Sequence, residues 1–254
     1  MLLKTNSLSI GYGNYTVLHD LNLSAEAGNL ICLIGTNGSG KSTLLRTLGG
    51  LQKQLNGNIS IQGKILSKLS HYERSLIFSF VLTDAIDQDN MTVFDLVALG
   101  RFPYTNWAGS LSEKDMEMIN TSIAQVNLTA KRNSYLHEIS DGEKQRAIIA
   151  KALTQDTPLV LLDEPTAHLD LPNRIEIMLL LKKLSVNTHK TFIISTHELD
   201  LAMQVANIVW LIHLQGVEVG IPNDLIQSSK LQQIFSSESF YFDQKDGCFS
   251  VKIK

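Results

Sequence analysis

The chain has 254 residues, of which 44% are hydrophobic, and its formal net charge at pH 7 is −3. This length and composition allow one large domain or two small ones with a substantial core, and the small net charge argues against a protein that binds nucleic acid by bulk electrostatic attraction. No apolar stretch approaches the roughly 18 to 20 residues that span a bilayer, and residues 1–6 do not resemble a secretory signal, so we expect another chain to hold the protein wherever it works at a membrane.

The first third of the sequence carries strand patterns around one helix pattern. Leu8 to Leu23 alternates in the way of strands, with turn residues in its middle, and Leu30 to Ile34 is an uninterrupted apolar run typical of a buried strand. Lys41 to Leu48 has the pattern of a helix. Further strands are predicted at Gly57 to Gly63 and at Leu76 to Leu82.

Helix patterns then replace the strand patterns before strands return. The predicted helices are Thr92 to Leu99, Ser112 to Val126 and Asp141 to Leu153, each with Ser, Thr or Asp at its start. The later elements are strands at Leu159 to Leu162, Thr191 to Ser195 and Ile208 to Leu214, and a helix at Asn173 to Leu184. This order predicts a parallel sheet covered by helices. We interpret residues 1–254 as a single domain, with about 84–155 inserted in it as a helical subdomain.

Residues 35–43 read Gly-Thr-Asn-Gly-Ser-Gly-Lys-Ser-Thr between a predicted strand and a predicted helix. This context is that of a phosphate-binding loop, whose glycines let backbone N–H groups turn toward phosphate oxygens. Lys41 is expected to reach the outer phosphates, Ser42 to ligate Mg²⁺ and Thr43 to bind a phosphate oxygen. An ordinary glycine-rich turn is the alternative. The predicted nucleotide-binding residues of the loop are Gly35, Thr36, Asn37, Gly38, Ser39, Gly40, Lys41, Ser42 and Thr43.

Two acidic residues, Asp163 and Glu164, follow the predicted strand at Leu159 to Leu162. Carboxylates at the carboxyl end of such a strand stand where open α/β sheets bind ligands. We expect Asp163 to hold Mg²⁺ through water and Glu164 to polarise an attacking water. Alone, the pattern is also typical of a structural strand that ends in an acidic turn, but the phosphate loop in the same chain favours the functional interpretation.

Three further stretches occur in a fixed order: Ile139-Ser-Asp-Gly-Glu143, Ala167-His-Leu-Asp170 and Ser195-Thr-His197. Together with the phosphate loop, they make the chain resemble an ATP-binding-cassette (ABC) ATPase subunit from Tyr12 to about Gly220. The resemblance implies an α/β P-loop ABC ATPase core with a mostly parallel central sheet, an antiparallel β part and an inserted helical subdomain.

Residues 139–143 resemble the family signature, usually Leu-Ser-Gly-Gly-Gln; Ser140 and Gly142 match it, whereas Asp141 and Glu143 depart from it. The resemblance implies a homodimer in which the signature of one copy closes over ATP held by the phosphate loop of the other. The residues also fit a simple helix N-cap with acidic residues in its first turn, and this alternative stays open.

The resemblance assigns other residues. His197 is expected to contact the γ-phosphate and to orient water beside Glu164, and Asp170 to order the dimer interface. Tyr12 is expected to stack on adenine, with ordinary packing as the alternative and Tyr15 as the second choice. Most cassette ATPases carry a metal-binding glutamine where this chain has Thr83 followed by Asp84. Thr83 either takes that role, by closer approach of the backbone or through water, or only caps its strand, and Gln88 is a further substitute if the loop folds back.

Val97-Ala-Leu-Gly-Arg-Phe-Pro-Tyr104 resembles importer ATPases that serve iron-siderophore, haem and cobalamin uptake; the pattern also fits a helix C-terminus. Phe102, Tyr104 and Trp107 are candidates for receiving a permease helix. The implied function is Mg²⁺-dependent ATP hydrolysis for chelate import, at the cytoplasmic face of the inner membrane, with permease subunits and indirectly a substrate-binding protein. The alternative is a non-transport ABC ATPase in DNA maintenance or translation, but no coiled-coil insertion or second cassette is visible, and no nucleic-acid partner is expected.

The two cysteines, Cys32 and Cys248, lie far apart in the sequence, and Cys32 stands inside an apolar strand pattern. Buried free thiols in a reducing compartment are therefore expected rather than a disulfide or a metal site.

Overall fold

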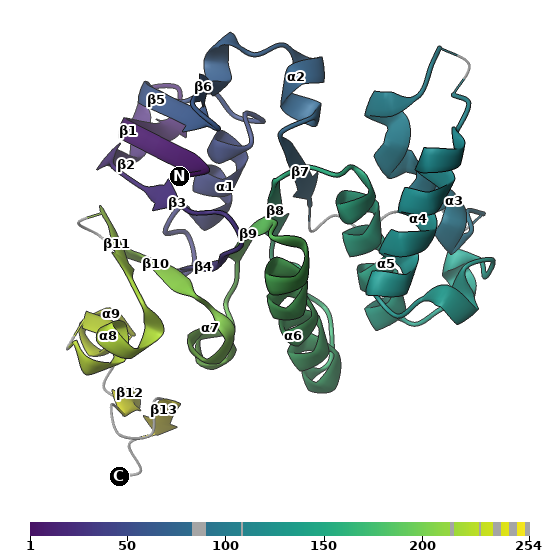
Figure 1. Cartoon of the computed structure of the whole chain (residues 1–254). Coiled ribbons are helices and arrows are strands. Elements are labelled where there is room, and N and C mark those ends of the chain that lie inside the picture. Colours follow the sequence, from purple (N-terminus) through teal and green to yellow (C-terminus); the bar gives the residue numbers. More distant parts are fainter. Residues whose placement is uncertain are drawn as a thin grey trace.

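A six-stranded sheet in the order β11-β10-β4-β9-β8-β7 forms the centre of the molecule (Figure 1). The computed structural model describes residues 1–82, 90–107, 109–213, 216–228, 230–235, 240–243 and 248–251. The pairs from β10 to β7 are parallel, and β11 pairs antiparallel with β10. The strands are β4 (Leu30–Ile34), β7 (Phe78–Val81), β8 (Leu159–Asp163), β9 (Thr191–Ser195), β10 (Ile208–His213) and β11 (Gly216–Gly220).

Four inner strands of this sheet, β4, β8, β9 and β10, are buried on both faces, which explains why they read as continuous apolar runs. In β4, Leu30, Cys32 and Ile34 belong to one core cluster, whereas Ile31 and Leu33 belong to the other. The first cluster packs under α6 (Leu171–Thr188) and α7 (Leu199–Val205). The second contains the apolar face of α1 (Lys41–Leu48). The central sheet therefore separates two cores.

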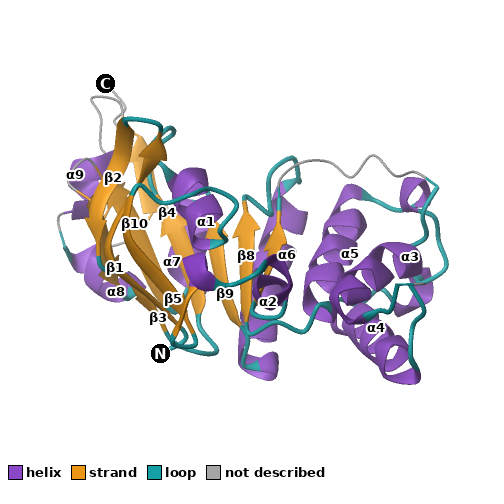
Figure 2. Ribbon diagram, turned by 90° about the horizontal axis from the view of Figure 1, so that it is seen from above, coloured by secondary structure: helices purple, strands orange, loops and turns teal. Residues whose placement is uncertain are grey.

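A smaller antiparallel sheet, formed by strands from the N-terminal part of the chain, covers the second core (Figure 2). Its order is β2-β1-β5-β6, with β3 paired to β1. The helix α1 packs against β1 as well as against β8 and β9, so it links the two sheets. The strands are β1 (Leu3–Tyr12), β2 (Tyr15–Leu21), β3 (Ser24–Ala25), β5 (Asn56–Ile61) and β6 (Lys64–Ile65).

The helices α3, α4 and α5 pack against one another beyond the β7 edge of the central sheet (Figures 1 and 2). Each begins at a capping box, formed by Thr92 with Asp95, Ser112 with Asp115, and Ser140 with Glu143. We call the part from α3 to α5 the helical lobe. Its helices are α3 (Val93–Ala98), α4 (Glu113–Gln125) and α5 (Asp141–Thr154), with 3₁₀ segments η2 (Leu99–Tyr104), η3 (Thr129–Lys131) and η4 (Leu136–Glu138).

The remaining elements are short. They are η1 (Leu66–Lys68), α2 (His71–Ser75), α8 (Pro222–Gln227), α9 (Lys230–Phe235), β12 (Phe240–Asp243) and β13 (Cys248–Val251). Within the described ranges, no helix combines the length and the apolar character needed to cross a membrane.

The sequence-based bounds were correct for β4, α1 and β9, and the mostly parallel central sheet is confirmed. The other predicted elements differ at one or both ends, most of them by one or two residues, and β1 begins at Leu3 rather than at Leu8. The strand β7 is shorter than expected, and α6 is longer than expected, because Asp170 caps it and Pro172 is tolerated in its first turn. Cys32 is a fully buried free thiol, as expected.

Candidate functional site

The phosphate loop connects the end of β4 with the start of α1, as the sequence pattern predicted. Gly38 and Gly40 have φ angles of 74° and 101°, which are left-handed conformations that favour glycine. A Cβ at Gly40 would also stand 2.6 Å from Cγ1 of Val17. The loop therefore needs glycine at both positions for its turn, and at Gly40 also for its close packing.

Lys41, the first residue of α1, is buried under this loop. Its Nζ donates hydrogen bonds to the carbonyl oxygens of Gly35 at 2.9 Å and Thr36 at 3.1 Å. Burial lowers the pKa of the ammonium group from its ordinary value of 10.5, while the negative charges of Glu164 and Asp163 oppose that shift. The loop thus wraps around a cation that faces the acidic end of β8.

The acidic end of β8 meets α1 and β9 at Asp163, which is almost fully buried. Ser42 Oγ donates to Asp163 Oδ1 at 2.9 Å, and Ser195 Oγ donates to the same oxygen at 2.6 Å. Arg46 Nε lies 3.9 Å from Asp163 Oδ2. A hydroxyl and a carboxylate side by side form the all-oxygen donor set that Mg²⁺ prefers, so the residues fit this ion.

Glu164 directly follows and has a φ angle of 48°, an unusual conformation for a residue with a side chain. Its backbone N–H donates to the carbonyl oxygen of Ser195 at 3.1 Å and to Ser195 Oγ at 2.9 Å. His197 Nε2 lies 2.6 Å from Glu164 Oε1. The strand end of β9 therefore fixes Glu164 from two sides and brings an imidazole to its carboxylate.

A cavity of about 470 Å³ joins these groups. Tyr12 is half exposed at its edge, and its Oη lies 3.1 Å from Thr43 Oγ1. The predicted site residues that line this cavity are Tyr12, Asn37, Gly38, Gly40, Lys41, Ser42, Thr43, Glu164 and His197. Thr36 and Ser39 line a neighbouring cavity of about 570 Å³, which also contacts Asn37, Gly38 and Tyr15.

The signature segment stands at the N-terminus of α5 in the helical lobe. Ser140 is the N-cap: its N–H donates to Glu143 Oε2 at 2.9 Å, and its Oγ accepts from the N–H of Glu143 at 3.3 Å. Asp141 is exposed, with an oxygen 3.7 Å from Lys144 Nζ. The two departures from the usual signature thus take local roles at a helix start, which the sequence left open as an alternative.

Gly142 is the point where the signature segment touches α6. A Cβ on Gly142 would lie 2.3 Å from Asn173 Oδ1, and Asn173 Nδ2 donates to Asp170 Oδ1 at 2.7 Å. Asp170 also caps α6 by accepting from the N–H of Asn173 at 3.1 Å. None of the signature residues or Asp170 is among the described residues that line the nucleotide cavity, so the structure does not bring them to the phosphate loop of the same chain.

The sequence reasoning gave no role to Ser195 or Arg46. Ser195 could have been found from its pattern, since it is a polar residue at the end of an apolar strand and another predicted strand ends in acids. Arg46 carried no such signal beyond its position one helical turn after Ser42. Thr83, the third metal candidate, lies outside the described residues, as do Asp84 and Gln88.

A further recess of about 770 Å³ lies between α2 and the lobe residues Phe102, Pro103, Thr105, Asn106, Trp107 and Gly109. We call it the lobe groove. Its α2 wall includes Tyr72 and Ser75, and its lobe wall includes Phe102 and Trp107, which are 78% and 100% exposed. Side chains of this kind on a surface favour contact with another apolar segment.

Comparison with known proteins agrees with this geometry. A family model described as ABC transporter matches residues 18–167. An uncharacterised ABC transporter ATP-binding protein of Methanocaldococcus jannaschii is 36% identical over 99% of this chain and 87% of its own length. A petrobactin import ATP-binding protein of Bacillus anthracis is 34% identical over 93% of this chain and 87% of its own. A solved inward-facing structure, described as a metal-chelate type ABC transporter, matches with a TM-score of 0.82 at 26% identity and covers 100% of this chain and 98% of the other.

Proposed function

The chain belongs to the ABC transporter family as an ATP-binding subunit that hydrolyses ATP, and we propose that this hydrolysis powers the import of an iron-siderophore, haem or cobalamin-type chelate through a partner permease. Relatives at 34% identity, among them a petrobactin import protein and a siderophore transport protein of Bacillus subtilis, support this class of cargo. One observation carries the chemistry: a single cavity is lined by Lys41, Glu164 and His197.

We assign the hydrolytic step to Glu164, assisted by His197. A water beside the γ-phosphate loses its proton toward the Glu164 carboxylate as its oxygen attacks phosphorus, while the bond from phosphorus to the oxygen that bridges the β- and γ-phosphates breaks and ADP leaves with that oxygen. The imidazole 2.6 Å away holds the carboxylate in place. Lys41 and the loop N–H groups balance the charge of the phosphates, and Tyr12 receives the base. Ser42 and Asp163 would hold Mg²⁺, which supplies further positive charge at the phosphates when bound.

We further propose that a second copy of the chain completes each site. Ser140 and Gly142 stand at the N-terminus of a 14-residue helix, whose free N–H groups favour an anion, yet they do not line their own chain's cavity. Asp141 and Glu143 shape this helix start, and Asp170 orders the loop beside it. In this arrangement, residues 1–254 act as one nucleotide-binding domain with the helical subdomain at about 84–155.

The lobe groove is the proposed docking place for the permease, with Phe102 and Trp107 on its apolar side and Tyr104 next to them in the chain. Such docking would hold the subunit at the cytoplasmic face of the inner membrane and connect it indirectly to a substrate-binding protein. Co-purification from native membranes, followed by identification of the bound membrane protein and chelate, tests this part. Recovery with DNA-maintenance or translation proteins instead would contradict it.

The ATPase assignment is tested by Glu164→Gln, with Glu117→Gln on the exposed face of α4 as the matched control. Phosphate release by the Glu164 variant should fall by about 10² to 10⁴, because this is the usual contribution of a positioned acid-base group. ATP binding should persist, and size measurement with Mg²⁺-ATP should detect a dimer. A Glu164→Gln protein that is fully active and monomeric would overturn the assignment.

A further inference from the structure

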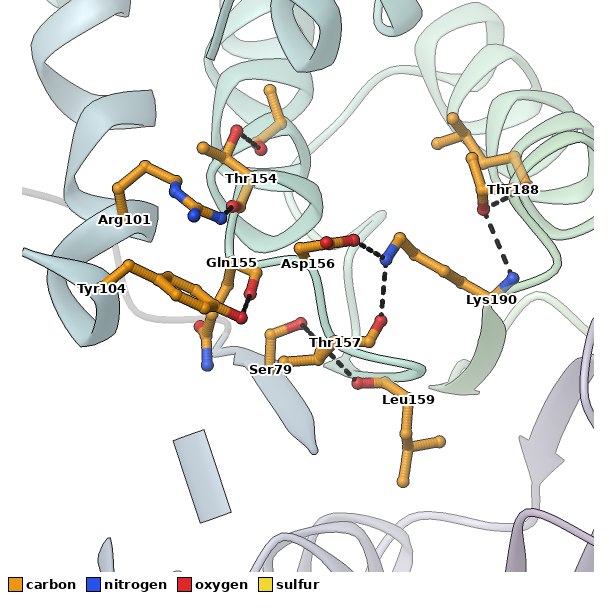
Figure 3. A network of polar contacts seen from close by, with 12 residues as sticks. Ser79, Arg101, Tyr104, Thr154, Gln155, Asp156, Thr157, Leu159, Thr188 and Lys190 are labelled. Atoms are coloured by element: carbon orange, nitrogen blue, oxygen red, sulfur yellow. Dashed lines mark hydrogen bonds and ion pairs between the residues drawn. The ribbon is translucent and has the colours of Figure 1, made fainter. Parts of the chain in front are cut away.

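Gln155 links the α2 wall of the lobe groove to the helical lobe, and Figure 3 shows its contact with Tyr104 on the lobe side. Its side-chain Nε2 donates to the carbonyl oxygen of Ser75 at 2.8 Å, and Ser75 belongs to the α2 wall. Its own carbonyl oxygen accepts from Tyr104 Oη at 3.0 Å, and Tyr104 stands in the chain between Phe102 and Thr105, which both line the lobe wall. One residue therefore contacts the central part of the molecule through its side chain and the lobe through its backbone.

The contact with the central part is anchored at the sheet itself. Gln155 Nε2 also donates to the carbonyl oxygen of Phe78 at 3.1 Å, at the first residue of β7. Two residues later, Thr157 Oγ1 donates to Ser79 Oγ at 3.1 Å, and Lys190 Nζ donates to the carbonyl oxygen of Thr157 at 3.0 Å. The segment between α5 and β8 is thereby tied to β7 and to the start of β9.

The contact with the lobe is anchored by Arg101. This buried guanidinium donates from Nη1 to the carbonyl oxygen of Thr154 at 2.9 Å and from Nε to Asp115 Oδ1 at 2.7 Å. Its Cζ lies 3.8 Å from the centre of the Tyr104 ring, a cation–π geometry. Arg101 therefore locks Tyr104 and the C-terminal end of α5 into one unit.

The helix that ends at this unit begins at the signature. The 14 residues of α5 span about 21 Å at 1.5 Å per residue, with Ser140 at one end and Gln155 at the other. A helix of this length transmits a tilt at one end as a displacement at the other. We propose that Gln155 is a positioning residue: by pinning the end of α5 to Ser75 and Phe78, it sets where the lobe holds Ser140, and it couples that position to the width of the lobe groove.

This inference rests on the proposed function only where it has Ser140 contact a nucleotide. That the hydrogen bonds of Gln155 to Ser75 and Phe78 hold the lobe in place concerns distances within one chain and does not depend on that function. We therefore separate two readouts. The first is the distance between spin labels at Ser67→Cys in η1 and Lys114→Cys in α4, both exposed, in the full chain with Cys248→Ser and with the fully buried Cys32 retained. The second is the KM and kcat of Mg²⁺-ATP hydrolysis.

Gln155→Met keeps the length of the side chain and removes the donor, whereas Gln155→Lys restores a donor. Tyr104→Phe removes only the hydroxyl that reaches Gln155. We expect Gln155→Met and Tyr104→Phe to broaden or shift the label distance. Gln155→Met should also lower kcat by about 10- to 100-fold, because a misplacement of about 1 Å can cost 10²-fold in rate. The KM for ATP should be unchanged, because the phosphate loop is untouched. Gln155→Lys should restore both readouts.

Gln125→Ala is the matched control, because Gln125 ends α4 in the same lobe and no side-chain hydrogen bond of it is found among the described residues. A folded Gln155→Met protein with the wild-type label distance would overturn the proposal. In that case Gln155 would only stabilise the turn at 75–78, and its loss would lower the melting temperature without moving the lobe. If Gln155→Met does not fold, the label distance in Tyr104→Phe decides. If the label distance broadens in the variants but the wild-type chain has no ATPase activity, the proposed function is contradicted, whereas the positioning role of Gln155 is supported.

Discussion

Ser195 Oγ donates a hydrogen bond of 2.6 Å to Asp163 Oδ1, and these two residues stand opposite each other at the ends of neighbouring parallel strands. The same Oγ accepts from the backbone N–H of Glu164. One hydroxyl therefore orients both the proposed metal ligand, Asp163, and the proposed catalytic carboxylate residue, Glu164.

Ser195→Ala should lower the rate of Mg²⁺-ATP hydrolysis, because Asp163 and Glu164 both lose a partner. The buried carboxylate and N–H that lose a hydrogen bond should also decrease the free energy of unfolding by about 1–3 kcal/mol. Ser185→Ala is the control: this buried serine of α6 donates only to the carbonyl oxygen of Lys182 at 2.8 Å, away from the cavity. Phosphate release and urea unfolding measure both effects, and equal rates for the two variants would contradict the role of Ser195.

The role of Ser195 could not be predicted from the sequence, because it depends on which strands are neighbours in the folded sheet. The acids of β8 could be predicted, because they follow an apolar run in a chain with a phosphate loop, whereas the histidine after β9 was assigned by the family resemblance. The hydrogen bond between Asp163 and Ser195 depends on β8 and β9 being neighbours in register, and strand order in a parallel sheet follows from tertiary packing. Gln155 was missed for the same reason: its partners, Ser75 and Phe78, are about 80 residues away in the chain.

The elements that the sequence predicted best have local causes. The strand β4 is an apolar run that a glycine ends, and the helices of the lobe begin at Ser or Thr with an acid three residues later. The short helices α7, α8 and α9 were not predicted, because six or seven residues carry too few apolar positions to define a period, and packing decides their conformation.

Lys41→Ala should abolish most of the ATP-dependent stabilisation of the chain while leaving its fold intact. A bound ligand at 100 times its Kd stabilises by about 2.7 kcal/mol, and the variant lacks the cation that we propose binds the phosphates. Without ATP, the melting temperature should change only modestly, because the loss of the two hydrogen bonds to Gly35 and Thr36 is offset by relief of the cost of burying the ammonium group. Thermal melts with and without Mg²⁺-ATP measure this, with the exposed Lys183→Ala as control; an undiminished ATP shift in the Lys41 variant would contradict the assignment.

Cys32 should be unreactive toward thiol reagents in the native protein. Burial raises the pKa of this thiol to about 12 from its ordinary value of 9.0, although the charge of Lys182 lowers it slightly. The difference of three pH units, 12 minus 9.0, reduces the thiolate fraction about 10³-fold at neutral pH, and the thiolate is the reactive form. In a Cys248→Ser chain, alkylation at pH 8 should require denaturant, and rapid native labelling would contradict the burial of Cys32.

The buried ion pair between Arg101 and Asp115 should make stability depend on acid pH. Burial alone would raise the pKa of Asp115, but the Ser112 hydroxyl, the Ser112 N–H and the Arg101 guanidinium together lower it below its ordinary value of 3.8. A carboxyl whose folded pKa is depressed contributes stability that is present above its unfolded pKa and is lost as pH falls through its folded pKa. The contribution should therefore be full at neutral pH and decline only below about pH 4.

Asp115→Asn measures that contribution, with Glu113→Gln, an exposed residue on the same helix, as control. Because Asn leaves the buried Arg101 uncompensated, the variant should lose about 3–5 kcal/mol of unfolding free energy at pH 7. The gap to the wild type should narrow as pH falls below 4, since protonation then removes the same charge from the wild type. Urea unfolding at several pH values follows the gap, and a difference that stays constant down to pH 2 would mean that the charge of Asp115 does not stabilise the lobe. Because Arg101 also binds the carbonyl oxygen of Thr154, the Asp115→Asn variant should in addition loosen the end of α5 that Gln155 pins.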